Sequence, residues 1–165
     1  MLRGMPEVIA VPEVVADRIR ERARALGVAP EVYLMDLVTE GLDPESRAEE
    51  YAAAAEEILR QAGSELERGN VRQAAEKLWG ACALAVKAYA YWREGRRLVS
   101  HGELREYKDR MAAELGDWVV VAFQQASDMH TCFYEGWCTR TDVEIALKAS
   151  ERLVRAVASR VLGRG

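Results

Sequence analysis

The chain has 165 residues, half of them hydrophobic and 30% charged, with a formal net charge of -4 at pH 7. This length fits one domain of ordinary size, and the acidic balance argues against a broad electrostatic footprint for nucleic acid. No apolar run approaches the roughly 18 residues of a membrane span, and the first residues lack the long apolar core of a secretion signal, so we expect a cytoplasmic protein without membrane contacts.

Residues 1–42 predict a small strand-helix-helix unit. The short β-branched run at 7–11 is closed by Pro12 and predicts a strand. A helix over 12–26 follows, and a second helix over 30–38 begins with proline at the favoured first position. One strand and two helices cannot enclose much core, so we expect this unit to pair with a second copy in a homodimer.

This order resembles the ribbon-helix-helix module, in which two chains pair their strands and intertwine their helices. The resemblance is carried by the layout of VIAVPEVVADRIRERARALGVAPEVYLMDLV and by its xVPxxV start. In DNA-binding members, polar or basic side chains on the strand read the major groove. The strand here carries no Lys, Arg, Asn, Gln or Thr, so dimerisation is favoured over DNA binding. A DNA-binding regulator acting through this unit stays open as an alternative.

Residues 43–165 predict an antiparallel helical bundle. A helix over 44–68 has one apolar stripe, whereas the helix over 69–92 is nearly apolar all round after residue 78, with Lys87 as its only charge there. A helix of that kind belongs at the centre of a bundle. The two-residue connection makes the pair an antiparallel hairpin, and Asn70 is expected to cap the second helix.

Three further helices complete the all-α prediction. The first runs over 101–115 behind a capping box of Ser100 and Glu103, and the second runs over 118–137. The last is predicted to begin at a capping box of Thr141 and Glu144 and to end near residue 162.

Two stretches of the bundle resemble the archaeal PaREP family, small helical proteins placed with the HEPN-like folds (higher eukaryotes and prokaryotes nucleotide-binding). They are AAEKLWGACALAVKAYA at 74–90 and ASDMHTCFYEGWCTRTDVE at 126–144, and the second fits a pattern of alanine, three residues, histidine, then an aromatic pair and a glutamate. The resemblance spans about 51–157 and implies a HEPN-like bundle with a dimer interface. It implies no activity, because HEPN-like folds include ribonucleases and proteins without known chemistry.

Arg96 and His101, in RRLVSH, are the candidate catalytic pair. HEPN ribonucleases carry an arginine and a histidine spaced by four to six residues: histidine moves protons near neutral pH, and arginine holds the scissile phosphate. That motif normally lies late in the bundle, whereas this pair follows the central helix. A solvated loop and a helix start are therefore the alternative interpretation.

His130 is the centre of a candidate ligand-binding flank with Phe123, Tyr134 and Trp137. On an ideal helix these residues lie beside the core seam and could stack a base or another planar ligand. The alternative is a packing surface against another helix or a second chain. Glu135 and Asp128 point away from this flank, which argues against a metal site there.

The three cysteines predict neither a disulfide framework nor a metal site. Cys82 falls on an apolar stripe and is expected in the core, and Cys132 and Cys138 lack CxxC spacing. No phosphate-cradling Gly loop, nucleophile elbow or HExxH motif occurs, so we predict no cofactor. A single Asn beside twenty Glu and nineteen Arg is typical of a heat-adapted source.

The sequence thus favours a non-catalytic, dimeric HEPN-like module that binds a nucleotide, RNA or a protein partner, with a toxin–antitoxin-like system as one setting. The alternatives are a metal-independent ribonuclease, using Arg96 and His101 or His130 with an arginine from elsewhere, and the DNA-binding regulator.

Overall fold

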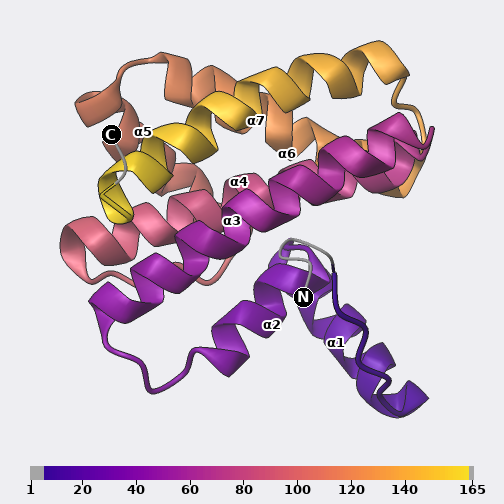
Figure 1. The fold of residues 1–165 in the computed structure, drawn as a ribbon, viewed down its shortest axis with the longest axis horizontal. Helices are drawn as coiled ribbons and strands as arrows, with labels where there is room; N and C mark the ends of the chain where they lie inside the picture. The colour runs from indigo at the N-terminus through magenta and orange to yellow at the C-terminus, as the bar shows by residue number, and fades with distance from the viewer. Residues whose placement is uncertain (1–5, 164–165) are drawn as a thin grey trace.

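The computed structural model describes residues 6–163, and over that range the chain is all-helical, without a strand (Figure 1). The helices are α1 (Glu13–Leu26), α2 (Pro30–Val38), α3 (Pro44–Glu67), α4 (Val71–Glu94), α5 (His101–Leu115), α6 (Trp118–Glu135) and α7 (Arg140–Val161). None of the helices in the described part is both long enough and apolar enough to cross a membrane.

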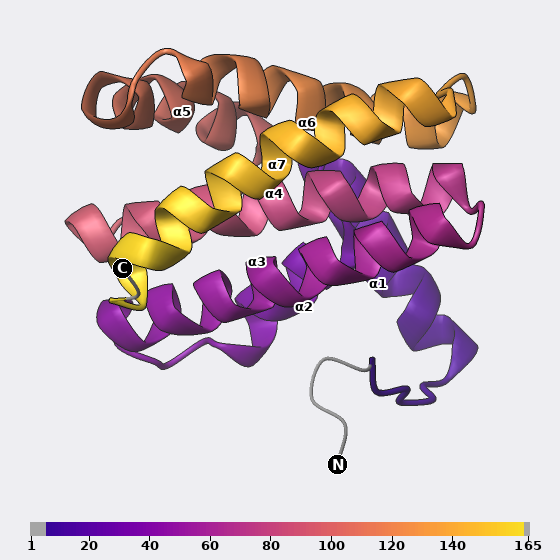
Figure 2. The same ribbon diagram turned by 45° about the horizontal axis from the view of Figure 1, so that its top comes forward.

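Helix α4 is the centre of the bundle, as its apolar pattern predicts. Every residue from Leu78 to Tyr91 is buried. Helices α3, α5, α6 and α7 all pack against it, and Figure 2 shows α4 and α7 between α3 on one side and α5 and α6 on the other. The many alanines of α3 and α4 let their backbones approach closely, which suits the antiparallel hairpin that these helices form.

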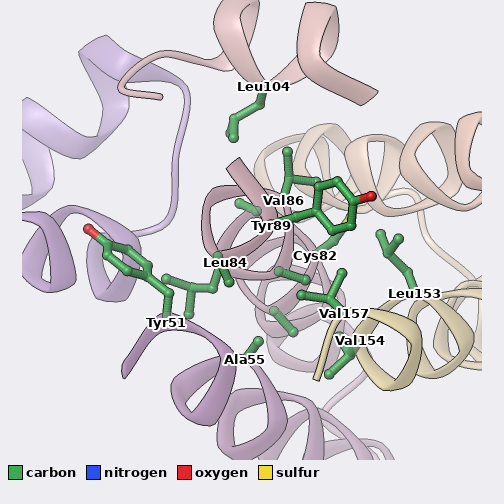
Figure 3. Close-up of a cluster of buried hydrophobic side chains, with 14 of the residues drawn as sticks. Tyr51, Ala55, Cys82, Leu84, Val86, Tyr89, Leu104, Leu153, Val154 and Val157 are labelled. Atoms are coloured by element: carbon green, nitrogen blue, oxygen red, sulfur yellow. The ribbon is translucent and has the colours of Figure 1, made fainter. Parts of the chain in front are cut away.

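The core gathers side chains of α3, α5, α6 and α7 around α4. Figure 3 shows Leu104 of α5, Tyr51 of α3 and Leu153 of α7 among the side chains that converge on this helix. Its largest aliphatic members are fully buried, and each stabilises the fold by about 1.5–3 kcal/mol through removal of apolar surface from water. The labelled core residues are Tyr51, Ala55, Cys82, Leu84, Val86, Tyr89, Leu104, Leu153, Val154 and Val157.

A buried ion pair ties α2 to α4. The Lys87 ammonium lies 2.9 Å from the Asp36 carboxylate, and the two side chains are 0% and 5% exposed. Lys87 also donates to the backbone carbonyl of Leu98, and the Tyr51 hydroxyl donates to Asp36. Burial lowers the pKa of Lys87, while the Asp36 charge opposes that shift. The one charge in the apolar part of α4 is therefore held by a partner from the N-terminal region.

The N-terminal region differs from its prediction at the strand. Residues 7–11 form no strand, and Val8 and Ile9 are 93% and 83% exposed. A strand needs a second strand to receive its backbone hydrogen bonds, and the described chain offers none. Helices α1 and α2 match their predicted extents closely and form a V beneath α3 in Figure 1.

Two predicted caps change. Thr139, not Thr141, caps α7, and it forms a reciprocal capping box with Asp142, because the helix begins two residues earlier than predicted. Asn70 makes no cap bond, since its amide donates to Glu65 across the turn. Ser100 caps α5 as predicted by accepting from the Glu103 amide.

The prediction of no disulfide is wrong, because the structure pairs Cys132 with Cys138, whose Cα atoms are 5.3 Å apart. Helix α6 ends at Glu135, and Gly136 adopts a left-handed conformation with φ +74° that turns the chain back toward the helix. Six residues of separation then suffice to bring the two sulfur atoms together. Cys82 is free and buried in the core, as predicted, and burial raises its pKa to about 12.

Candidate functional site

The chain's two histidines meet at one buried tryptophan. Trp79 of α4 is 0% exposed, and its ring centroid lies 5.0 Å from that of His101 and 5.9 Å from that of His130. Its indole N–H donates to the Gly27 carbonyl, in the turn between α1 and α2, at 3.2 Å. This contact fixes the N-terminal region against the bundle at the place where both histidines lie.

His130 is held by a buried carboxylate. Its Nδ1 lies 3.0 Å from Glu76 Oε2, and its ring packs edge-on against Tyr134 at 5.0 Å between centroids. Glu76 is only 6% exposed. Burial raises the pKa of Glu76, the hydrogen bond from His130 opposes that shift, and the nearby charge of Glu31 adds to it. The pair therefore joins α4 to α6 at a place where a second carboxylate is close.

His101 lies at the first turn of α5. Its Nε2 is 3.3 Å from the Ser127 hydroxyl and 3.4 Å from the Arg105 guanidinium. Burial lowers the pKa of His101, and the charge of Arg105 lowers it further. Gly27 is required beside it, because its φ is +70° and a Cβ there would lie 2.9 Å from His101 Cβ. The neutral imidazole is thus the favoured form of His101.

A cavity of about 690 Å³ opens between the N-terminal helices and the bundle. Helices α1 and α2 form one wall, and α4 and α6 form the other. The lining residues are Arg20, Glu21, Arg24, Ala25, Pro30, Glu31, Gln73, Glu76, Phe133 and Tyr134. The cavity lies within the range of volumes of small-molecule sites.

The cavity wall carries three kinds of recognition group. Arg20 and Arg24 of α1 can hold an anion, and the Arg24 guanidinium lies over the Tyr134 ring at 5.1 Å. Tyr134 offers an aromatic surface, and the carboxylates of Glu31 and Glu76 accept hydrogen bonds. Within residues 6–163 no group of three or more His, Cys, Asp or Glu side chains could hold a metal ion.

Comparison with protein-family models shows to which family the chain is related. The model of the archaeal PaREP1/PaREP8 family matches residues 50–154, well over half of the chain. The chain belongs to this family. Neither a curated protein nor a solved structure matches it. The PaREP match covers most of α3 to α7 and therefore the α4 and α6 wall of the cavity, while α1 and α2 lie outside the matched range.

Within this PaREP fold, the predicted catalytic pair is not brought together. Arg96 is exposed, and its guanidinium lies over the Tyr107 ring at 5.5 Å. His101 has Arg105 as its arginine neighbour instead. The i,i+4 spacing of His101 and Arg105 on a predicted helix is the signal that would have found this pair. A catalytic role for Arg96 or His101 stays a prediction.

The predicted ligand-binding flank is brought together in part. His130 contacts Tyr134 directly, and Phe123 packs edge-on against Trp79 at 5.5 Å, behind the cavity wall. Trp137 is 46% exposed, and its indole donates to Glu135, away from the cavity. Sequence reasoning missed Glu76 and the arginines of α1. No local signal marks any of them, because Glu76 lies off the predicted apolar stripe of its helix and the arginines of α1 are spread around theirs.

Proposed function

We propose that this PaREP protein is a dimeric, non-catalytic module that binds a nucleotide in the cavity between α1, α2 and the bundle. The observation that carries the proposal is the composition of the cavity wall. Guanidinium groups suit a phosphate, an aromatic ring suits a base, and carboxylates suit the N–H groups of the base or the hydroxyls of the ribose. All three are found around one cavity of about 690 Å³.

The histidines support binding rather than turnover. Neither His101 nor His130 is among the residues that line the cavity. His130 is occupied by Glu76, and His101 packs against Trp79 and Phe123. Both rings are therefore engaged in contacts within the protein.

The N-terminal region supports the dimer. Val8, Ile9 and Val14 are 93%, 83% and 71% exposed, and Val38 at the end of α2 is 71% exposed. One chain offers these side chains no cover, whereas the strand pairing of a ribbon-helix-helix dimer would bury them.

We also include in the proposal a HEPN-like arrangement of the bundle, a cytoplasmic location, a heat-adapted source and a toxin–antitoxin-like setting.

Calorimetric titration of the full chain with GMP and with AMP tests nucleotide binding. Arg24→Ala should weaken binding about tenfold or more, because a charge-assisted hydrogen bond contributes roughly 1.5–3 kcal/mol. Arg22→Ala, two residues along the same helix and outside the cavity lining, should leave the affinity unchanged. Failure of the parent chain to bind any nucleotide overturns the proposal.

Sedimentation of the full chain and of single variants tests the dimer. Ile9→Asp should give monomers, because the charge would be buried where two N-terminal segments meet. Ile145→Asp places the same charge on α7, at a residue that is 52% exposed, and should leave the dimer intact. A dimer that persists in Ile9→Asp contradicts the proposed interface.

A metal-independent ribonuclease is the second candidate, because His101 and Arg105 lie 3.4 Å apart. Histidine and arginine are the pair that such chemistry uses. Incubation of single-stranded RNA with the parent, His101→Ala and His130→Ala, with a chelator present, separates the two functions. Cleavage that depends on either histidine would replace the binding module with the nuclease.

A further inference from the structure

We infer that the cavity selects guanine among the nucleobases, through the carboxylates of Glu31 and Glu76. This inference rests on the proposed binding of a nucleotide in the cavity and adds the identity of the base.

The two carboxylates lie together over one face of α4. Glu76 and Gly80 are four residues apart and so lie one helical turn apart on the same face. The Glu31 carboxylate of α2 comes over Gly80, where a Cβ would lie 3.9 Å from Glu31 Oε2. The absence of a side chain at Gly80 leaves room for Glu31, whose charge adds to the rise in the pKa of Glu76 that burial causes.

Only one of these acceptors is occupied within the protein. Glu76 is bonded to His130, whereas Glu31 has no hydrogen bond or ion pair with any residue between 6 and 163. The arginines of the cavity do not neutralise it, since Arg20 pairs with Asp17 and Arg24 lies over Tyr134. Two adjacent carboxylates on a cavity wall, one of them unpartnered, suit a ligand that presents N–H donors.

Guanine is the base that meets this requirement. Its Watson–Crick edge presents N1–H and the N2 amino group side by side, and a carboxylate can accept from both. Adenine and cytosine place an acceptor nitrogen beside their amino group, and uracil flanks its single N–H with two carbonyl oxygens. An acceptor facing a carboxylate leaves a buried polar group unpaired, which is the usual basis of discrimination between such ligands.

The other lining residues of the cavity suit the phosphate and the flat face of the base of a guanine nucleotide. Arg20 and Arg24 lie on α1, across the cavity from α4, and can receive the phosphate. Tyr134 and the Arg24 guanidinium are the two kinds of flat group on which bases stack.

Affinities of GMP, IMP and AMP for the full chain test the inference. IMP keeps N1–H and lacks the amino group, so the expected order is GMP, then IMP, then AMP, with GMP bound at least about tenfold more tightly than AMP. Glu31→Gln should weaken GMP binding about tenfold and leave AMP binding unchanged, because glutamine presents a donor where guanine also presents one. Glu49→Gln, on the exposed face of α3, is the matched control and should change neither affinity.

The outcomes separate this inference from the function beneath it. Equal affinities for GMP and AMP, or an equal loss of both in Glu31→Gln, would overturn guanine selection and leave nucleotide binding standing. Absence of binding by all three nucleotides would overturn both.

Discussion

The bundle and the N-terminal region differ in how completely each covers its apolar side chains. In the bundle, every residue of α4 from Leu78 to Tyr91 is buried by neighbouring helices. In the N-terminal region, Val8 and Ile9 are almost fully exposed, and residues 7–11 have no strand partner among residues 6–163. The central helix of the bundle is thus covered within one chain, whereas the N-terminal region has apolar surface that residues 6–163 leave uncovered.

The cavity lies where these two regions meet. Its α4 and α6 wall is fixed by the packing of Trp79, His130 and Glu76, and its α1 wall belongs to the helix with the least buried surface. A rigid wall opposite a lightly packed one is suited to a site that admits and encloses a ligand. Variants at contacts between the regions and variants inside the bundle separate what joins the two regions from what stabilises the bundle alone.

Removal of the ion pair between the regions should have the largest effect. Lys87→Ala should lower the free energy of unfolding by about 3–5 kcal/mol, because it leaves the Asp36 carboxylate buried without its partner. Denaturant unfolding measures this. The double variant Lys87→Met with Asp36→Leu removes both charges and should recover most of the loss; a Lys87→Ala chain as stable as the parent would show that the regions are not joined here.

The disulfide should contribute the next largest effect. Cys132→Ser should lower the free energy of unfolding by about 2 kcal/mol, because the unfolded chain loses the constraint of a short loop. Cys138→Ser should cost the same amount, and the double variant should cost no more than either single variant. Additive losses in thermal or denaturant unfolding would indicate that the two cysteines act separately.

The cap of α7 offers a smaller and sharper comparison inside the bundle. Thr139→Ala should cost about 1 kcal/mol, because it removes the side chain that accepts from the Asp142 amide. Thr141→Ala, two residues later and exposed, should change the free energy of unfolding by less than about 0.5 kcal/mol. A larger loss of stability in Thr141→Ala than in Thr139→Ala would show that Thr141 caps the helix, as the sequence predicted.

The smallest expected effect is a pH dependence of the free energy of unfolding that comes from His101, which lies beside Gly27 where the two regions touch. The folded-state pKa of His101 is below its ordinary value of 6.5, so the unfolded chain takes up the proton first as pH falls. The contribution of His101 to stability is therefore complete above pH 6.5 and is lost as pH falls through the folded-state pKa. The free energy of unfolding of His101→Gln, measured across that pH range, should lack this part of the dependence on pH. A pH dependence equal to that of the parent chain would contradict a lowered pKa of His101.

The helices were predictable because their signals are local, and the site was not because its contacts are distant. Periodicity and caps placed α2 and α5 at their observed bounds. The partner of Lys87, however, lies 51 residues away, and that of His130 lies 54 residues away. The strand was over-predicted because its signal, a run of β-branched residues, is local, whereas a strand also needs a second strand to accept and donate its backbone hydrogen bonds. The disulfide was missed because it depends on the turn at Gly136.

A crystal structure of the full chain grown with GMP tests the central claim most directly. We expect the nucleotide between α1 and α4, with its base at Glu31 and Glu76 and its phosphate at Arg24. A saturated crystal with GMP bound elsewhere, or with this cavity closed by protein side chains, would contradict it.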